Sequence, residues 1–328
     1  RIVTQGTPLE AEKNPHSLIG PYLSGKESLK VRSRATEKDM FENGSIRIKT
    51  KPFYTVKALD VSIPKGRMIA VTGVSGSGKT SLVIECLVPA LQAVIQGTKL
   101  PEHVDSIEAK GIQSVKVIDS KPIGANVRST VATYDGVFDD LRKLFARTAD
   151  AKAKGLTAGD FSYNTGKLRC PVCDGTGIIT MDVQFLPDVD TICPSCGGSR
   201  YGKDAYDILW KSKEKDSVSV SLPGLLKLTV EEAAGILHEE TKIAKQLKIL
   251  QDLGVCYLTL GEATPALSGG EAQRLKLAYE METPQQGSVF VFDEPTIGLH
   301  PQDVKKLVLI FDHLIQLGAT VIAIEHDL

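Results

Sequence analysis

The chain has 328 residues, of which 42% are hydrophobic and 24% are charged, and its formal net charge is −1. This composition is typical of globular proteins, and the nearly neutral charge excludes a protein that binds nucleic acid over its whole surface. No apolar run approaches the roughly 20 residues of a membrane span, and no secretory signal pattern is present, so a cytoplasmic location is expected. Because the chain opens on Arg1 and stops directly after an apolar run, we expect a piece of a longer polypeptide.

Secondary-structure patterns along the chain predict a parallel sheet covered by helices. Short apolar runs of the kind that is buried on both faces alternate with helical periodicity, and a Gly-rich turn follows one of them, which is typical of α/β proteins. The expected strands are 45–50, 67–72, 115–119, 288–292 and 320–324, and the expected helices are 81–91, 139–147, 229–253 and 304–317.

The segment Gly73-Val-Ser-Gly-Ser-Gly-Lys79-Thr80 matches the phosphate-loop pattern GxxxxGK[ST] in full, between a predicted strand and a predicted helix. Glycines let consecutive backbone N–H groups face phosphate oxygens, and the helix N-terminus favours an anion. We expect Lys79 to reach the β- and γ-phosphates of ATP and the Thr80 hydroxyl to bind Mg²⁺. The alternative is a Gly-rich turn with a chance lysine. The predicted nucleotide-binding residues are Gly73, Val74, Ser75, Gly76, Ser77, Gly78, Lys79, Thr80 and Ser81.

A second apolar strand ends in two carboxylates, Asp293 and Glu294. We expect Asp293 to bind nucleotide-associated Mg²⁺ and Glu294 to act as the general base that polarises the attacking water. After the next strand, His326 is expected to reach the γ-phosphate end of the site. A single histidine after a strand is more often a surface residue, so this prediction depends on the phosphate loop. Lys79, Glu294 and His326 are the predicted catalytic residues.

The motif Leu267-Ser-Gly-Gly-Glu271 precedes a predicted helix, whose N-terminal N–H groups would form an anion site. A capping box between Ser268 and Glu271 explains the same residues, and both interpretations can hold together. LSGGE is the signature of ABC ATPases, and residues 293–300 (DEPTIGLH) resemble the Walker B and D-loop segment of that family. The resemblance implies that the signature closes on the γ-phosphate of another ATPase unit. The predicted nucleotide-binding residues here are Ser268, Gly269, Gly270 and Glu271.

Four of the six cysteines form two CxxC pairs, Cys170 with Cys173 and Cys193 with Cys196. In a chain without a secretion signal, this spacing predicts metal binding rather than disulfides. Two such turns supply four thiolates, which favours tetrahedral zinc, and four protein ligands make a structural site. Reduced cysteines without metal and an iron–sulfur cluster are the alternatives.

Basic and aromatic residues are interspersed around these cysteines. Such residues on a small module could bind nucleic acid, or they could be a solvated rim around a small core. The sequence does not separate the two interpretations. The residues are Lys167, Arg169, Arg200, Lys203, Tyr163, Phe185 and Tyr201.

The combination of motifs resembles the UvrA family, the ATPase subunit of the nucleotide-excision-repair excinuclease. Ordinary ABC cassettes place the signature near the phosphate loop, whereas here the cysteine module lies between them, as in UvrA. Stretches such as VTGVSGSGKTSL, ATYDGVFDDLRKLFA, CPVCDGTG, LSGGEAQRLKLA and VIAIEHDL resemble the second ATPase half of UvrA, and residues 5–25 resemble the end of the first half. The resemblance therefore covers nearly the whole chain.

The resemblance implies an α/β, ABC-type P-loop NTPase fold with an inserted helical signature subdomain and a small zinc-binding module. Residues 1–44 would be the tail of a preceding ATPase half and a linker. Residues 45–158 would hold the first part of the ATPase core and the start of the signature subdomain. The zinc-binding module would span 159–215, the signature subdomain 216–287, and the truncated second part of the core 288–328.

The chain departs from the family at its Q-loop position. Ser120 stands where the family has a glutamine that helps to place Mg²⁺ and water, and Lys121 stands where it has a serine. These departures indicate a divergent UvrA-like paralogue with unusual or slow turnover. Tyr54 lies upstream of the phosphate loop at about the distance where ABC proteins stack an aromatic ring on adenine.

The resemblance implies an ATPase, not itself a nuclease, that binds ATP, Mg²⁺ and Zn²⁺ and clamps on damaged double-stranded DNA. Its partners would be a second ATPase half or a second copy, and a UvrB-like repair subunit reached through the missing first half. One alternative is a UvrA-like ABC ATPase for antibiotic resistance. Another is the ATPase cassette of a membrane transporter, against which the cysteine module argues because such cassettes have no use for it.

Overall fold

The computed structural model describes residues 2–27, 35–124, 126–181, 189–212, 218–281, 285–297, 299 and 301–326. It divides into two compact units, one formed by Arg1–Asp119 with Pro284–Leu328 and the other by Ser120–Thr283. No helix in the described residues is long and apolar enough to cross a membrane. The five-segment division of the sequence stays a prediction.

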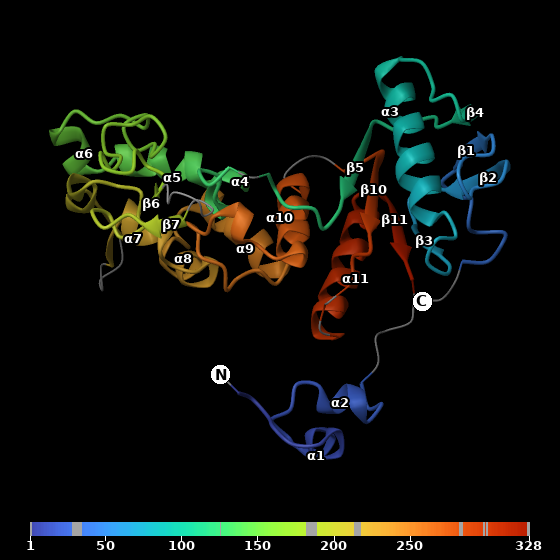
Figure 1. Ribbon diagram of the computed structural model, residues 1–328, viewed down its shortest axis with the longest axis horizontal. Helices are drawn as coiled ribbons and strands as arrows, with labels where there is room; N and C mark the ends of the chain where they lie inside the picture. Colours follow the sequence, from blue (N-terminus) through green and yellow to red (C-terminus); the bar gives the residue numbers. More distant parts are fainter. Residues whose placement is uncertain are drawn as a thin grey trace. The chain divides into compact units, whose positions relative to one another are not determined.

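The first unit is built on a four-stranded parallel sheet (Figure 1). The strands β10 and β11 are buried along almost their whole length, as expected for parallel strands that are covered on both faces. The predicted strands at these positions are confirmed. In spatial order they are β3 (Met68–Thr72), β11 (Thr320–Glu325), β10 (Ser288–Asp293) and β5 (Ser114–Ile118).

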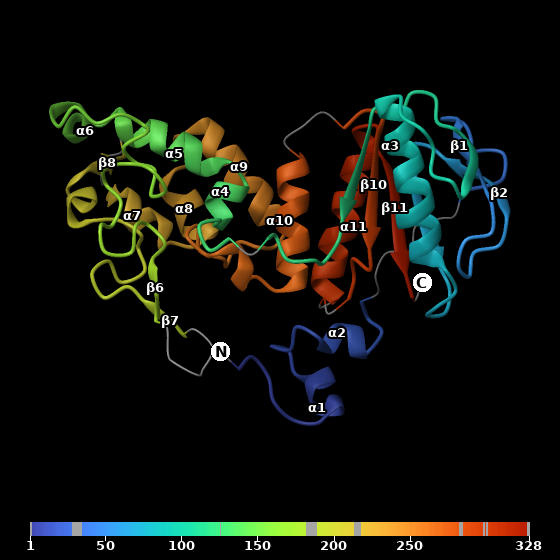
Figure 2. The ribbon, with the colours of Figure 1, turned by 45° about the horizontal axis from the view of Figure 1, so that its top comes forward.

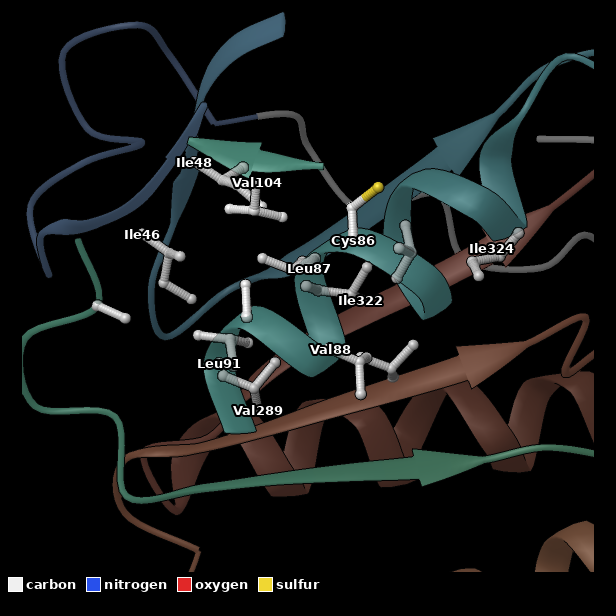
Figure 3. Close-up of a cluster of buried hydrophobic side chains, with 14 residues drawn as sticks. Ile46, Ile48, Cys86, Leu87, Val88, Leu91, Val104, Val289, Ile322 and Ile324 are labelled. Atoms are coloured by element: carbon white, nitrogen blue, oxygen red, sulfur yellow. The ribbon is translucent and has the colours of Figure 1, made fainter. Parts of the chain in front are cut away.

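Alternating side chains of β10 face two different layers. Val289 and Val291 belong to the buried cluster that includes the helix α3 (Val88–Gln96), shown in Figure 3. On the other face, Phe292 contacts Phe311 of α11 (Pro301–Gln316), with ring centroids 4.5 Å apart. The period of two residues along a strand therefore places one helix on each face of the sheet.

A three-stranded antiparallel sheet completes this core. Its order is β2 (Leu59–Pro64), β1 (Ser45–Thr50) and β4 (Val104–Glu108). Ile46 and Ile48 of β1 are buried and pack on the same cluster as α3 (Figure 3). The predicted strand at 45–50 is thus confirmed, and it covers the helix that follows the phosphate loop.

The helix after the phosphate loop is longer than predicted and begins with π-helical geometry. The π-helical segment η1 (Ser81–Leu87) continues directly into α3, so the helix extends to Gln96 rather than to residue 91. Pro89 has no N–H and cannot donate to the carbonyl of Glu85 four residues earlier. The change of helical hydrogen bonding thus occurs where an α-helix would lack a donor.

The second unit is mainly helical, with α8 and α9 side by side and α5 against α9 (Figures 1 and 2). The single predicted helix 229–253 is wrong, because the chain ends α8 at Ile236 and begins α9 at Thr241, so that both apolar faces meet. The helices are α4 (Val131–Tyr134), α5 (Val137–Ala146), α6 (Ala149–Ala153), α7 (Leu222–Leu226), α8 (Val230–Ile236), α9 (Thr241–Asp252) and α10 (Gly269–Met281).

Short elements complete both units, and the sequence patterns did not predict them. Two short helices lie in the segment expected to be a linker, where a capping box at Thr7 begins the first. These elements are α1 (Pro8–Lys13), α2 (Gly20–Leu23), the hairpin strands β6 (Ile178–Met181) with β7 (Val189–Ile192) and β8 (Leu209–Lys211) with β9 (Ser219–Ser221), and the 3₁₀ turns η2 (Lys203–Asp207) and η3 (Thr264–Ala266).

Candidate functional site

The loop after β3 has the backbone conformation that a phosphate loop requires. Gly76 and Gly78 have φ values of +79° and +92°, a region that side chains with a Cβ rarely enter. A Cβ on Gly78 would also lie 2.8 Å from Thr55 Oγ1 and 2.9 Å from Val56 Cγ2. Only glycine therefore fits at Gly78, and the loop can turn its backbone N–H groups inward.

Lys79 is held inside this loop. Its side chain is largely buried, and its ammonium donates to the carbonyl oxygens of Gly73, at 2.7 Å, and Val74, at 3.2 Å. The same Nζ lies 3.4 Å from Nδ1 of His326. The lysine thus connects the phosphate loop with the end of β11.

Sheet topology explains why residues so distant in sequence meet. In the parallel register, Thr72 of β3 is opposite Glu325 of β11, and Ile324 is opposite Asp293 of β10. The carboxyl ends of three neighbouring strands therefore lie at one edge, which is where open α/β sheets bind ligands. Thr80 and Ser81 continue into the helix after the loop, beside this edge.

Glu294 and His326 form a close pair at this edge. The Nε2 of His326 lies 2.5 Å from Oε1 of Glu294, and Nδ1 faces the Lys79 ammonium. Because an ammonium only donates, Nδ1 must accept and Nε2–H must donate to the carboxylate. Glu294 also has φ +50° while its N–H donates to Ile324 O at 3.0 Å. Such a strained non-glycine residue is typical of functional sites.

Two further residues at this edge were missed by sequence reasoning. Oε1 of Glu325 accepts hydrogen bonds from the Thr296 N–H at 3.1 Å and from its hydroxyl at 2.8 Å. This contact ties the turn after β10 to the end of β11. The adjacency of Glu325 to His326 was the available signal, but its partner depends on strand pairing.

In the second unit, Ser268 and Glu271 form the predicted capping box. The Ser268 N–H donates to Glu271 Oε2 at 2.7 Å, and the Glu271 N–H donates to the Ser268 hydroxyl at 3.4 Å. Tyr257 donates to the other carboxylate oxygen at 2.7 Å. Burial raises the pKa of Glu271, but the hydrogen bonds from Tyr257 and Ser268 lower it below its usual value. The cap at the start of α10 is therefore anionic at neutral pH.

Ser120, at the Q-loop position, lies against this signature. A Cβ on Gly269 would lie 3.1 Å from the carbonyl oxygen of Ser120 and 3.2 Å from its Cβ. Lys276 of α10 donates to the carbonyl of Lys121 at 2.8 Å. The segment that departs from the family pattern thus packs on the first turns of the signature helix.

The four cysteines of the CxxC pairs converge, with all four sulfurs within 4.8 Å of one another. The Sγ atoms of Cys170 and Cys193 are 4.0 Å apart, and those of Cys173 and Cys196 are 3.7 Å apart. The Gly177 N–H donates to Cys173 Sγ at 3.3 Å. Three of these cysteines are buried and Cys196 is half-buried. Four thiolates at this separation fit tetrahedral zinc.

The side chains around the cysteines mostly form the core of their module. Tyr163 and Tyr201 are at most 1% exposed, and the Tyr201 hydroxyl donates to Phe161 O at 2.6 Å. Arg200 is also buried, donating to Thr176 O at 3.0 Å and covering the Tyr163 ring. Burial lowers the pKa of Arg200.

The two tyrosines therefore belong neither to a nucleic-acid-binding surface nor to a solvated rim, the two interpretations that the sequence left open, because their rings are buried. Among the basic residues, the exposed Lys167 pairs with Asp160 at 3.6 Å, and Arg169 pairs with Asp174 at 2.9 Å. Lys203 is exposed, at the start of a 3₁₀ turn. Phe185 lies outside the described residues. Lys167, Arg169 and Lys203 remain as candidate contacts for a phosphate backbone.

Comparison with curated proteins shows which proteins the chain is similar to. It is 41% identical over 334 residues to the UvrABC system protein A of Staphylococcus aureus (strain COL), an alignment that includes 100% of this chain. The chain is a UvrA homologue. The UvrABC system protein A of Aquifex aeolicus (strain VF5) is 40% identical over 331 residues, again across the whole chain. The chain spans 34% and 35% of the lengths of these two relatives. No family model matches the chain.

A solved structure supports the same relationship. The crystal structure of UvrA2 from Deinococcus radiodurans matches 99% of this chain with a TM-score of 0.86 and 38% sequence identity, over 38% of that protein. The α/β P-loop fold of ABC type predicted from the motifs is thus confirmed. The UvrA likeness covers both units, including the cysteine cluster.

In this UvrA homologue, the structure brings together three sets of predicted residues, one in the first unit and two in the second. The phosphate loop, Asp293, Glu294 and His326 meet at one sheet edge, the signature residues cap α10, and the cysteines form one cluster. His300, the last residue of the Walker B and D-loop resemblance, lies outside the described residues. The nucleotide and metal roles of these residues stay predictions.

Proposed function

We propose that this chain is the C-terminal ATPase half of a UvrA-like subunit of nucleotide excision repair. The observation that carries the proposal is the likeness to UvrABC system protein A across the whole chain, joined to a sheet edge where Lys79, Glu294 and His326 are in contact. The protein binds ATP with Mg²⁺ and hydrolyses ATP to ADP and phosphate. It does not itself cut DNA.

Each residue at the sheet edge has a distinct task in hydrolysis. Lys79 exchanges its two loop carbonyls for phosphate oxygens when ATP enters, since its ammonium already lies within the loop. Thr80 and Asp293 would hold Mg²⁺, which neutralises phosphate charge when bound. Glu294 accepts a proton from the attacking water. His326 orients Glu294 through their 2.5 Å contact, while its Nδ1 faces the Lys79 ammonium.

The signature completes the site of another ATPase unit rather than its own. The Ser268 hydroxyl and the N–H groups at the start of α10 supply the anion site. The partner is either the first ATPase half of the same polypeptide or a second copy of the chain. A UvrB-like repair subunit binds through that first half, and the cytoplasm is the expected location.

The cysteine cluster holds one structural zinc, and its module contributes to binding double-stranded DNA. Support comes from four converging sulfurs and from the exposed Lys167 nearby. The small net charge means that DNA contact is confined to such local patches. Nucleotide-dependent closure of two ATPase halves would then change the affinity for DNA, so that binding to damaged duplex is favoured.

A direct test measures binding of the protein to intact duplex DNA and to duplex carrying a bulky lesion, at several salt concentrations. The expected result is an affinity that falls steeply with salt, because phosphate contacts release counterions, and a preference for the damaged duplex in the presence of ATP. Absence of DNA binding by the protein that contains both ATPase halves would overturn the repair function. It would leave the antibiotic-resistance ATPase, which shares the ATP site and to which the altered Ser120 segment also points.

A further inference from the structure

Three aromatic rings lie in contact beside the phosphate loop. The rings of Phe53 and His103 are stacked, with centroids 4.0 Å apart and planes at 17°, and the Tyr54 ring packs on Phe53 at a tilt of 54°, with centroids 4.3 Å apart. Phe53 is half-buried against the main core cluster, whereas Tyr54 is 80% exposed. Sequence position had singled out only Tyr54, the outermost ring.

The turn that carries Tyr54 is strained and lies directly on the phosphate loop. Phe53 and Val56 exchange two backbone hydrogen bonds of 2.9 Å, which leaves Tyr54 and Thr55 at the tip. Tyr54 has φ +50°, a conformation that aromatic residues rarely adopt. Thr55 and Val56 occupy the space that a Cβ on Gly78 would need. Strain of this kind persists where the surroundings enforce it, and it is common at ligand sites.

His103 is fixed by three independent contacts. Its Nε2 lies 2.8 Å from the carbonyl oxygen of Glu85, and its own carbonyl accepts the Lys51 N–H at 2.9 Å. Pro89 leaves the Glu85 carbonyl without an α-helical donor, so the histidine N–H supplies a bond to it. The third contact is the stack on Phe53.

The neighbours of this histidine anchor it to the core. Val104, which follows His103, and Cys86, which follows Glu85, are both buried in the core cluster and are labelled in Figure 3. Glu85 belongs to the helical segment that begins directly after the phosphate loop. The ring stack is thus tied to the same helix whose N-terminus faces the phosphates.

We propose that Phe53 and His103 are positioning residues that hold the Tyr54 ring as the stacking surface for the adenine base of ATP. The inference rests on the proposed binding of ATP at Gly73–Thr80. The π-face of Tyr54 supplies the contact with the base, and the two rings behind it prevent Tyr54 from relaxing out of its strained conformation. His103 acts through Phe53 and Tyr54 and does not itself contact the nucleotide.

The experiment compares two probes, MgATP and magnesium tripolyphosphate, which carries the three phosphates without a base. Tyr54→Ala is expected to weaken ATP binding about tenfold, a typical value for loss of one stacked base. His103→Ala is expected to weaken it about threefold to fivefold, as for loss of an aromatic pair. Both variants should bind tripolyphosphate like the wild type. In steady-state hydrolysis, His103→Ala should raise KM for ATP and leave kcat unchanged.

Two further variants make the test decisive. His103→Phe keeps the ring on Phe53 but loses the bond to Glu85, so its ATP affinity should lie between those of the wild type and His103→Ala. His313→Ala, an exposed histidine on α11, is the matched control and should change nothing. Thermal melting checks that each variant is folded.

The outcomes separate this inference from the proposed function. If the wild type binds neither probe, ATP binding itself is refuted. If the wild type binds ATP but His103→Ala binds it equally well, the positioning role is refuted. Equal weakening of ATP and tripolyphosphate in His103→Ala would also refute it, because the loss would then not concern the base. A His103→Phe variant no better than His103→Ala would refute the role of the stack.

Discussion

The two candidate sites of this chain are built in opposite ways. The phosphate-loop site gathers Lys79, Glu294 and His326 from three strand ends, on a core of apolar residues that does not depend on them. The cysteine site draws its sulfurs from two local turns, and three of the four cysteines form a small buried cluster, with Ile179 and Cys196 packed beside them. Replacing a residue of the phosphate-loop site should therefore abolish function without unfolding the protein. Replacing a cysteine of the cluster should unfold the surrounding module.

The largest effect should come from the cysteine site. Cys170→Ser removes one of the four proposed ligands, and binding of structural zinc contributes about 10–16 kcal/mol to the folding of small zinc domains. We expect zinc to fall from about one ion per chain to almost none, with loss of a melting transition from the second unit. Metal analysis and calorimetry measure both. Cys256→Ser, outside the cluster, is the control, and zinc retained at full occupancy in Cys170→Ser would contradict the site.

Lys79→Ala tests the prediction for the phosphate-loop site, where function should be lost without loss of folding. Loss of the ammonium that reaches the phosphates should reduce ATP turnover by at least about 100-fold without changing the melting temperature by more than a few degrees. Hydrolysis assays and thermal melting measure the two effects. The exposed Lys99→Ala on the same unit should behave like the wild type. Unchanged hydrolysis in Lys79→Ala would refute the assigned phosphate loop.

A smaller effect should appear in the buried ring cluster beside the cysteines. Tyr201→Phe removes the hydroxyl that donates to the Phe161 carbonyl and leaves that acceptor buried, which costs about 1–3 kcal/mol of unfolding free energy. Denaturant unfolding measures the loss, and ATP turnover should not change. Tyr206→Phe, whose ring is partly exposed, serves as the comparison. A Tyr201→Phe protein as stable as the wild type would show that this core does not depend on the bond.

The smallest effect concerns pH at the signature cap. Because the pKa of Glu271 is lowered in the folded protein from 4.5, its contribution to stability is present above pH 4.5 and is lost as pH falls through the lowered value. Glu271→Gln should therefore melt slightly below the wild type at pH 7, and the difference should shrink as the pH falls below 4.5. Melting curves across this range provide the measurement. A constant difference at all pH values would mean that the carboxylate charge is irrelevant.

Much of the first unit could be predicted from the sequence because its signals are local. The runs around Val289 and Ile322 are apolar at every position, which identifies doubly covered strands, and the motif at Gly73–Thr80 specifies its own turn. The spacing of the cysteine pairs likewise predicts the cluster of four sulfurs directly. In all three cases, the residues that matter are close together in the chain or follow one period.

What could not be predicted depends on contacts between distant residues. The break between α8 and α9 follows from packing of two apolar faces, which periodicity alone reads as one helix. The burial of Tyr201 and Arg200 follows from the fold of the module around them. The basic and aromatic composition of this segment had instead suggested that these side chains lie on the surface. The stack of His103 on Phe53 joins a loop to a turn some 50 positions away.

The most direct test of the central claim is single-site replacement of the proposed general base. Glu294→Gln keeps an oxygen that can accept from His326 Nε2 but cannot take a proton from water. The expected result is ATP binding within about twofold of the wild type and hydrolysis reduced by about 100- to 10,000-fold, measured on one preparation of the folded protein. Hydrolysis by Glu294→Gln at the wild-type rate would contradict the assignment of this sheet edge as the hydrolytic centre.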